Sequence, residues 1–371
     1  MQQTEYWVWL TTLPNMTSTK ITVLFEYFDT IEDIYKAKDF SRIPSLPRKE
    51  EQLLSGKDLA KAKEIIQKTN ESGAKILTYD DPLYPDQLRN ITDPPYVLYI
   101  KGEILPWDRL LGIGVVGTRK CSDYGSLVTH RLCSQLAKAG VTVISGMARG
   151  LDGVAAKAAL RAGAKTIAVL GCGIDIVYPP EHDALMEQIQ QHGCVMTEYP
   201  PGTPPLGSNF PQRNRIISGL SKGVLVTEAP KKSGALITAR YALDNGRDVF
   251  AVPGSILDWH YEGTNRLIQQ GAVLVMDAGD ILAEYPRDIR HLRPVGSKTP
   301  EEEDMVDTTA YEGLEEDEKK IASALSRENL HIDEISRRTG ISVPELNGKL
   351  ILLEMKNITG RLPGGYYKLN R

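Results

Sequence analysis

The chain has 371 residues, of which 41% are hydrophobic, enough for two or three domains with hydrophobic cores. Its formal net charge of -4 excludes a broadly basic protein, so any site for a polyanion has to be a focused pocket. The four cysteines lack the spacing of a zinc site, so we expect reduced thiols in a cytoplasmic protein without a bound metal. Apolar runs stay well short of about 18 residues and no signal-peptide pattern is present, so we expect no membrane contact.

Residues 1–74 are predicted to form a helical N-terminal domain. The segments TEYWVWLTTL, STKITVLFEYF and GKDLAKAKEIIQKTNESG each carry apolar residues three or four positions apart, which is typical of an amphipathic helix. From Lys75 to Gly102, alternating apolar residues interrupted by prolines predict short edge strands and loops.

Short runs of apolar and β-branched residues mark the centre of the chain. They are residues 111–117, 141–146, 166–171, 194–199, 223–229 and 248–254. Stretches of helical period lie between them, so strand and helix alternate in units of about 25–30 residues. This rhythm predicts an α/β fold over residues 75–292, an extended Rossmann-like parallel sheet with helices on both faces.

The last part of the chain is predicted to form a second structured region after a linker. Residues 293–313 are rich in Pro, Gly, Thr and acidic residues, which indicates a solvated acidic linker. Three helical patterns and a hairpin around Pro363 follow, and they predict a winged helix-turn-helix domain over residues 314–371.

Glycines and arginines follow the first three strands of the predicted sheet. Ligands of an open parallel sheet bind at the carboxyl ends of its strands, so these turns are expected to meet and to offer amides and helix N-termini to an anion. The alternative is that the glycines only allow tight turns. The residues concerned are Gly117, Thr118, Arg119, Gly146, Arg149, Gly150, Gly171 and Gly173.

Two familiar nucleotide motifs are not supported. The string from Gly112 to Gly117 formally matches G-x-G-x-x-G, but it lies mostly within a strand rather than in the turn after it. The second strand ends in Ser145, where a dinucleotide fold would place an acid on the ribose. No P-loop motif occurs, so we predict no NAD, no P-loop nucleotide and no other cofactor.

The segment NFPQRNRIISGLSKG places Arg213, Asn214 and Arg215 near the start of a predicted helix. Cations there oppose the helix dipole, so an anionic partner explains them better than solubility does. A guanidinium binds two phosphate oxygens with its planar fork, which makes phosphate the expected anion. Phe210 and Tyr199 are either base-stacking residues or ordinary core residues.

Carboxylates also stand at the predicted strand ends. No Ser-His-Asp order or histidine cluster accompanies them, so we expect them to accept hydrogen bonds from turn amides or to orient the arginines, and we predict no catalytic residue. The acids are Asp152, Asp175, Glu198 and Glu228. Two alternatives stay open: a hydrolase of nucleoside monophosphates with Glu198 or Glu228 as the acid, and a ligand-sensing winged-helix regulator.

Several motifs resemble the DNA-processing protein A family over roughly residues 75–290: VVGTR, SGMARGLD, TIAVLGCGIDIVYPPEH, TEYPPGTPP, FPQRNRIISGLSKGVLVTEAPKKSGALITARYAL and GRDVFAVPGS. The resemblance implies an N-terminal helical domain of the SAM or helix-hairpin-helix kind and a C-terminal winged helix. It also implies a non-enzymatic protein that binds single-stranded DNA, forms a homodimer and helps to load the RecA recombinase in natural transformation. Single-strand-binding protein is a further candidate partner.

The resemblance also implies roles for individual residues. Arg119 would hold a phosphate, the glycine amides would line the pocket, and Phe210, Arg213, Asn214, Arg215 and Arg240 would complete it. The expected dimer surface contains Leu267, Ile268 and Leu274. Pro180 departs from the family pattern, because members often have a DNA-contacting lysine there, and Arg149, Lys231 or Lys232 would have to compensate. The predicted recognition helix of the winged helix carries two acids and two bases, Glu345, Lys349, Glu354 and Lys356. Their charges cancel, so we do not expect strong duplex binding.

Overall fold

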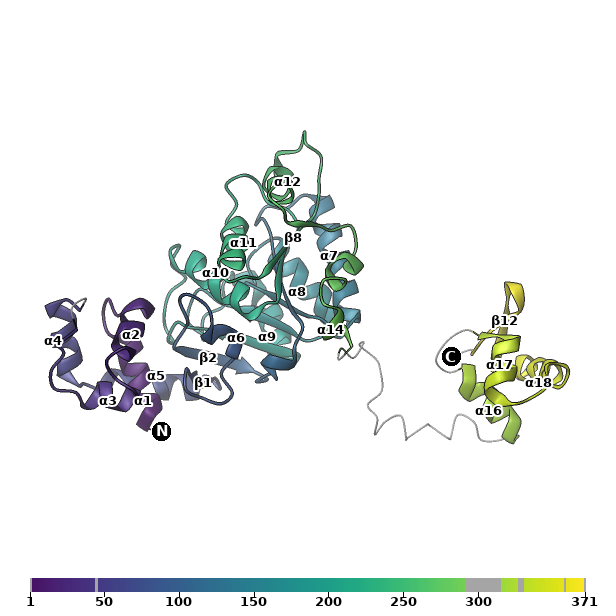
Figure 1. Cartoon of the computed structure of the whole chain (residues 1–371), viewed down its shortest axis with the longest axis horizontal. Helices are drawn as coiled ribbons and strands as arrows, with labels where there is room; N and C mark the ends of the chain where they lie inside the picture. The colour runs from purple at the N-terminus through teal and green to yellow at the C-terminus, as the bar shows by residue number, and fades with distance from the viewer. Residues whose placement is uncertain are drawn as a thin grey trace. The chain divides into compact units, whose positions relative to one another are not determined.

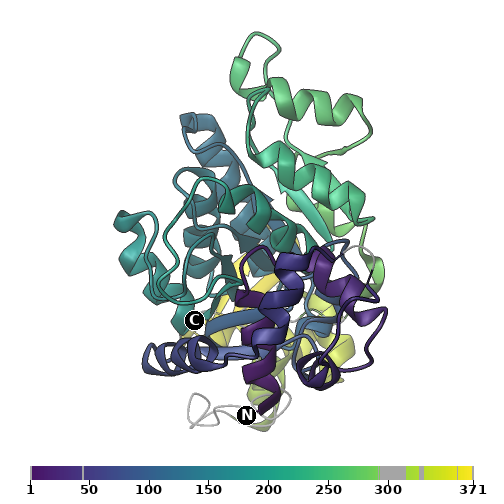
Figure 2. The ribbon, with the colours of Figure 1, turned by 90° about the vertical axis from the view of Figure 1, so that its left-hand side faces the viewer.

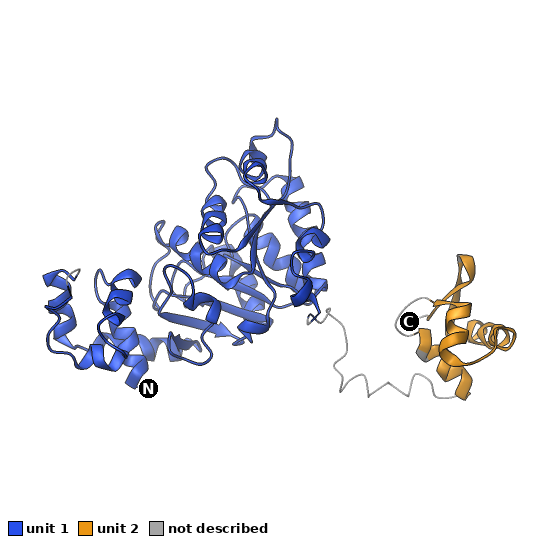
Figure 3. Cartoon of the chain, in the orientation of Figure 1, with its two compact units in different colours: residues 1–297 blue, residues 298–371 orange. Residues whose placement is uncertain are grey.

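The computed structural model describes residues 2–43, 46–290, 292, 315–325, 330–356 and 358–369. Two compact units result, residues 1–297 and 298–371, which are coloured separately in Figure 3. The predicted linker, residues 293–313, lies outside the described residues.

Helices form the N-terminal part of the first unit, as the apolar spacing predicted. They share a hydrophobic core with the beginning of the sheet. The Trp7 ring stacks on Phe25, with 5.3 Å between the ring centroids, and on Tyr96 just before β2, with 5.5 Å between the centroids. Figures 1 and 2 show them at the β1–β2 edge of the sheet. Their bounds are α1 Gln2–Thr12, α2 Ser18–Phe25, α3 Ile31–Lys36, α4 Arg48–Gly56 and α5 Ala60–Glu71.

A nine-stranded sheet forms the centre of this unit, in the order β1-β2-β6-β5-β4-β3-β7-β8-β9. Strands β3 to β9 are parallel, and β1 and β2 extend the sheet as an antiparallel edge. The bounds are β1 Lys75–Thr78, β2 Val97–Gly102, β3 Gly112–Val116, β4 Thr142–Ser145, β5 Thr166–Val169, β6 Gly193–Thr197, β7 Gly223–Val226, β8 Asp248–Ala251 and β9 Val273–Leu274. The predicted α/β fold is confirmed.

Helices cover both faces of the parallel strands, which explains why these strands are apolar throughout. One core layer lies under α7, α8 and α13, and the opposite layer lies under α6, α10 and α11. The helices are α6 Asp86–Arg89, α7 Asp123–Lys138, α8 Leu151–Arg161, α9 Asp183–Gln191, α10 Asn209–Leu220, α11 Ala235–Asp244, α12 Glu262–Gln269, α13 Ala278–Leu282 and α14 Pro286–Ile289. Gly114 lets α10 approach β3, because an added Cβ would lie 2.9 Å from Ser221 Oγ.

The second unit is a winged helix, as predicted. Its helices pack around a core that includes Ile335, Leu346 and Leu350. Gly340 has a left-handed φ of 73° and ends the first helix of the helix-turn-helix. The elements are α16 Glu316–Leu325, β10 Leu330–His331, α17 Ile332–Thr339, α18 Val343–Met355, β11 Thr359–Leu362 and β12 Tyr366–Leu369.

Candidate nucleic-acid interface

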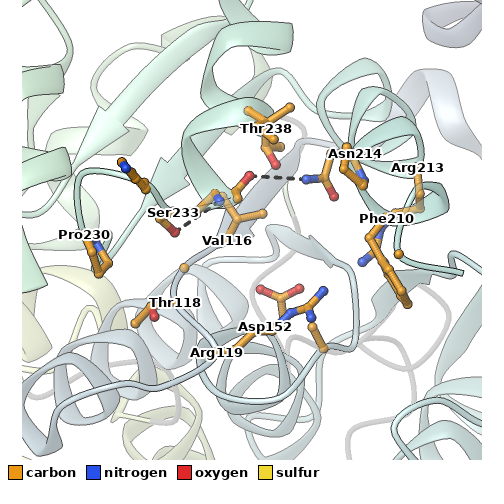
Figure 4. Close-up of a pocket in the computed structure, with 18 residues that line it drawn as sticks. Val116, Thr118, Arg119, Asp152, Phe210, Arg213, Asn214, Pro230, Ser233 and Thr238 are labelled. Carbon is orange, nitrogen blue, oxygen red and sulfur yellow. Dashed lines mark hydrogen bonds between the residues drawn. The ribbon is translucent and has the colours of Figure 1, made fainter. Parts of the chain in front are cut away.

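A pocket of about 460 Å³ opens where the carboxyl ends of β3, β4 and β7 meet. Strand β3 pairs with β4 on one side and with β7 on the other, so the strand order reverses at this point. Such a switch point is the usual ligand site of an open parallel sheet. Figure 4 shows its lining, which includes Gly117, Thr118, Arg119, Asp152, Phe210, Arg213, Asn214, Pro230, Lys232, Ser233 and Thr238.

Arg119 brings a free positive charge to this pocket. Its guanidinium carbon lies 5.1 Å from the ring centroid of Phe210, an arrangement in which the ring face attracts the cation. The side chain is exposed, and no carboxylate among the described residues pairs with it. Arg119 is therefore available to an anion from outside the chain.

Arg213 lies deeper and is held by the fold. Only 3% exposed, it donates hydrogen bonds to the carbonyl oxygens of Gly146 and Val169, the first at 2.7 Å. A Cβ on Gly146 would collide with the guanidinium, so the glycine makes room for it. Burial lowers the pKa of Arg213, and Arg119 adds to this, whereas the Asp152 carboxylate opposes it. Arg213 thus places a desolvated positive charge behind Arg119.

Arg215 does not line the pocket. Its Nε donates to Asp93 at 2.8 Å and its Nη2 donates to Glu198 at 2.5 Å, while the side chain is only 4% exposed. Burial works to lower the pKa of Arg215, but the Glu198 and Asp93 carboxylates outweigh it and raise the pKa. Two internal counter-charges therefore neutralise this arginine.

Two other predicted cations, Arg149 and Arg240, lie outside the pocket as well. Arg149 forms a two-pronged ion pair with Glu181, in which Nη2 lies 3.0 Å from Oε2. Arg240 is 84% exposed on α11, with its Nε 3.8 Å from Asp244. Asn214, by contrast, lines the pocket and donates to the Gly234 carbonyl at 3.4 Å (Figure 4).

The predicted glycine turns meet at this edge of the sheet, and they pack closely within the protein. Gly150 has a φ of 74° and lies against the Thr118 carbonyl, where a side chain would collide. A Cβ on Gly171 would lie 2.9 Å from the Phe210 ring, so this glycine seats the aromatic side chain. Among the predicted glycines, Gly117 lines the pocket, whereas Gly146, Gly150, Gly171 and Gly173 do not, and Gly173 lies against Asp175.

The strand-end carboxylates do what was expected of them. Asp152 accepts a hydrogen bond from the Gly146 amide at 3.2 Å, and Asp175 accepts one from the Gly202 amide at 2.9 Å. Glu198 accepts a hydrogen bond from the Arg215 guanidinium. Glu228 is fully buried and accepts the Ser122 amide at 3.1 Å. Burial raises the pKa of the Asp152 carboxyl, while Arg213 and the nearby amides act in the opposite direction. The prediction that these acids orient turns and arginines is confirmed.

The loop after β7 contributes two side chains to the pocket. Lys232, one of the three cations expected to compensate for Pro180, and Ser233 both line the pocket. Thr238 from α11 also lines it, and its buried Oγ1 has no hydrogen-bond partner among the described residues. The signal was present in the sequence, because KKSG follows a strand and opens a helix as the other turns do.

The predicted dimer residues lie on α12 and β9. Leu267 and Ile268 are half-buried, and Leu274 is 42% exposed beside Met276, which is 74% exposed. The cysteines are free thiols. Over the described ranges, no group of three His, Cys, Asp or Glu residues is placed to hold a metal ion. Within the same ranges, no helix has both the length and the apolar character needed to span a membrane.

Comparison with known proteins agrees with this geometry. The family model of DNA recombination-mediator protein A matches residues 75–286, and that of the DprA winged helix domain matches residues 306–365. Protein Smf from Synechocystis is 33% identical over 98% of both chains, and Protein Smf from Escherichia coli is 40% identical over 80% of this chain and 78% of its own.

Solved structures give the same result. DNA processing protein A from Streptococcus pneumoniae has a TM-score of 0.64 at 35% identity and covers 76% of this chain and 98% of its own. DNA processing protein A from Helicobacter pylori, described for its single-stranded DNA binding mode, has a TM-score of 0.53 at 29% identity and covers 58% of this chain and 98% of its own. The resemblance read from the motifs is confirmed, and the chain belongs to the DNA recombination-mediator protein A family.

Proposed function

We propose that this chain binds single-stranded DNA in the switch-point pocket, with Arg119 as the main phosphate contact. The observation that carries the proposal is the exposed Arg119 guanidinium, which rests on Phe210 and pairs with no carboxylate in the part of the chain that the structure describes. The Helicobacter pylori relative, described for its single-stranded DNA binding mode, supports this ligand. Lys232 and the buried Arg213 add positive charge on the other sides of the pocket.

Phosphate binding in this pocket depends on side chains more than on the glycine amides. The Gly146 amide already donates to Asp152, and the Thr118 amide donates to the Glu228 carbonyl at 2.9 Å. Arg119, Lys232 and the Asn214 amide group are therefore the proposed contacts. Contacts to phosphates carry no sequence information, so we expect little sequence preference.

The family supports a wider role in DNA processing. We propose that the protein acts in the cytoplasm as a homodimer through the Leu267, Ile268 and Leu274 surface, without catalysing a reaction itself. Bound single strands would be protected and handed to the RecA recombinase during recombination or natural transformation. Leu274 and its neighbour Met276 support the dimer proposal because they expose apolar surface beside α12.

The test is fluorescence anisotropy of a labelled oligo-dT with the wild type and with Arg119→Ala. Loss of a charged hydrogen bond costs about 1–3 kcal/mol, so we expect the affinity to fall by a factor of roughly 5 to 150. Arg131→Ala is the matched control, because Arg131 is an exposed arginine of α7 outside the pocket. No binding by the wild type, or equal binding by Arg119→Ala, would show that the pocket takes a smaller ligand.

A further inference from the structure

Helices α7 and α8 leave a groove on their outer side that the DNA pocket does not use. It has a volume of about 360 Å³ and is lined mainly by Leu127 and His130 from α7 and by Val154, Lys157 and Arg161 from α8. These positions repeat every three or four residues on each helix, so they form one continuous strip. Figure 1 shows the two helices on the same side of the sheet, and they pack against each other.

The apolar part of this groove lies on α7. Leu127 is 68% exposed, and Val154 from α8 is half-buried in the same wall. One turn before Leu127 lies Tyr124, also 53% exposed, which extends the apolar surface along α7. Removing such side chains from water favours association with an apolar group of a partner.

The charged part lies toward the C-terminal end of α8. Lys157 and Arg161 are one turn apart and exposed, and among the described residues no carboxylate pairs with either of them. Asp123, the acid in the groove lining, is the first residue of α7. Because β3 and β4 are parallel, α7 and α8 run in the same direction, so Asp123 lies at the end opposite Arg161.

We propose that this groove is a docking site for an acidic peptide segment of a partner protein. An aromatic or aliphatic side chain of the segment packs on Leu127 and Val154, and its carboxylates pair with Lys157 and Arg161. A DNA strand fits less well, because Asp123 repels phosphates and the groove lining contains the imidazole of His130 but no Phe, Tyr or Trp ring on which a base stacks.

The probe is a short synthetic peptide in which a run of glutamates adjoins one phenylalanine, labelled with a fluorophore and titrated with the full chain. Each exposed ion pair contributes up to a factor of about five, so Lys157→Gln/Arg161→Gln is expected to weaken binding by about tenfold. Leu127→Ser is expected to weaken it as well. Arg131→Gln is the matched control, since it removes an exposed cation of α7 that does not line the groove.

Three results would overturn the proposal. The first is no binding of the peptide by the wild type. The second is equal weakening in Arg131→Gln and in the double variant, which would indicate unspecific attraction to positive charge. The third is a loss of oligo-dT affinity in Lys157→Gln/Arg161→Gln without peptide binding, which would assign the groove to nucleic acid. Unchanged peptide binding in Arg119→Ala, and its loss when alanine replaces the phenylalanine of the peptide, would support the proposal.

Discussion

The switch-point pocket and the recognition helix of the winged helix use their cations in opposite ways. In the pocket, Arg119 is exposed and unpaired within the described residues. In α18, Lys349 lies 3.3 Å from Asp317, and Lys356, which follows the helix, lies 2.8 Å from Glu318, both acids of α16. Cations that are neutralised inside the fold have little to offer a phosphate. Whether the fold supplies counter-charges therefore says more about a nucleic-acid site than the number of basic residues does.

The same contrast exists between two neighbouring arginines of α10. Arg213 lines the pocket beside the Phe210 ring, whereas Arg215 is enclosed by Asp93 and Glu198. At 100° per residue, positions two apart on a helix face nearly opposite directions. Arg213 therefore faces the pocket. Arg215 connects α10 to Glu198, the residue after β6, and to Asp93 in the loop before β2.

The largest expected effect comes from removing the enclosed arginine. Arg215→Met leaves the Glu198 carboxylate, which is 18% exposed, without its cation, and we expect a loss of about 3 kcal/mol in the free energy of unfolding. Urea unfolding followed by circular dichroism measures this. Arg240→Ala, at an 84% exposed position, is the control and should change stability by less than about 0.5 kcal/mol. Equal stability of both variants would mean that Arg215 is not a structural brace.

A smaller effect concerns the salt dependence of DNA binding. With two phosphates neutralised by Arg119 and Lys232, the slope of log K against log salt should be about -1.4 for a single strand. Lys232→Ala should bring the slope to about -0.7, because one phosphate contact contributes about 0.7. Anisotropy titrations at several salt concentrations measure both slopes. A wild-type slope near zero would contradict an electrostatic pocket.

A further test separates the winged helix from DNA binding. Lys356→Ala leaves the buried Glu318 carboxylate with the Glu315 amide but without its cation, and it should destabilise the second unit by about 1–2 kcal/mol, while oligo-dT affinity stays the same. Thermal melting of the isolated second unit, alongside anisotropy of the full chain, provides the two measurements. A clear loss of oligo-dT affinity would show that the winged helix contributes to single-strand binding after all.

The smallest expected effect is on the pH dependence of the same unit. The Lys356 hydrogen bond lowers the pKa of Glu318 below its ordinary value of 4.5, despite the opposing effect of burial. A carboxyl with a lowered pKa in the folded state stabilises the fold above its unfolded pKa, and this contribution disappears as the pH falls through the folded pKa. Melting temperatures measured between neutral pH and about pH 3 should therefore fall less in Lys356→Ala than in the wild type.

Much of the fold could be predicted because its signals are local. Strands β3 to β8 appeared as short apolar runs at the predicted places, and the turns after β3 and β4 were correctly placed at the pocket. The acids at the strand ends were also correctly expected to bind turn amides and arginines. Each of these features depends on residues close in the chain, or on the rule that parallel strands end at one edge of a sheet.

The sequence by itself determined the alternation of strand and helix and the choice of arginine and glycine for the turns at the strand ends. Only the tertiary structure decided which of the basic side chains stay free. Asp93 reaches Arg215 across 122 positions of the chain, and the loop that carries Lys232 enters the pocket because β7 pairs with β3. A counter-charge acts through distance in space, and the spacing of residues along the chain does not contain that distance.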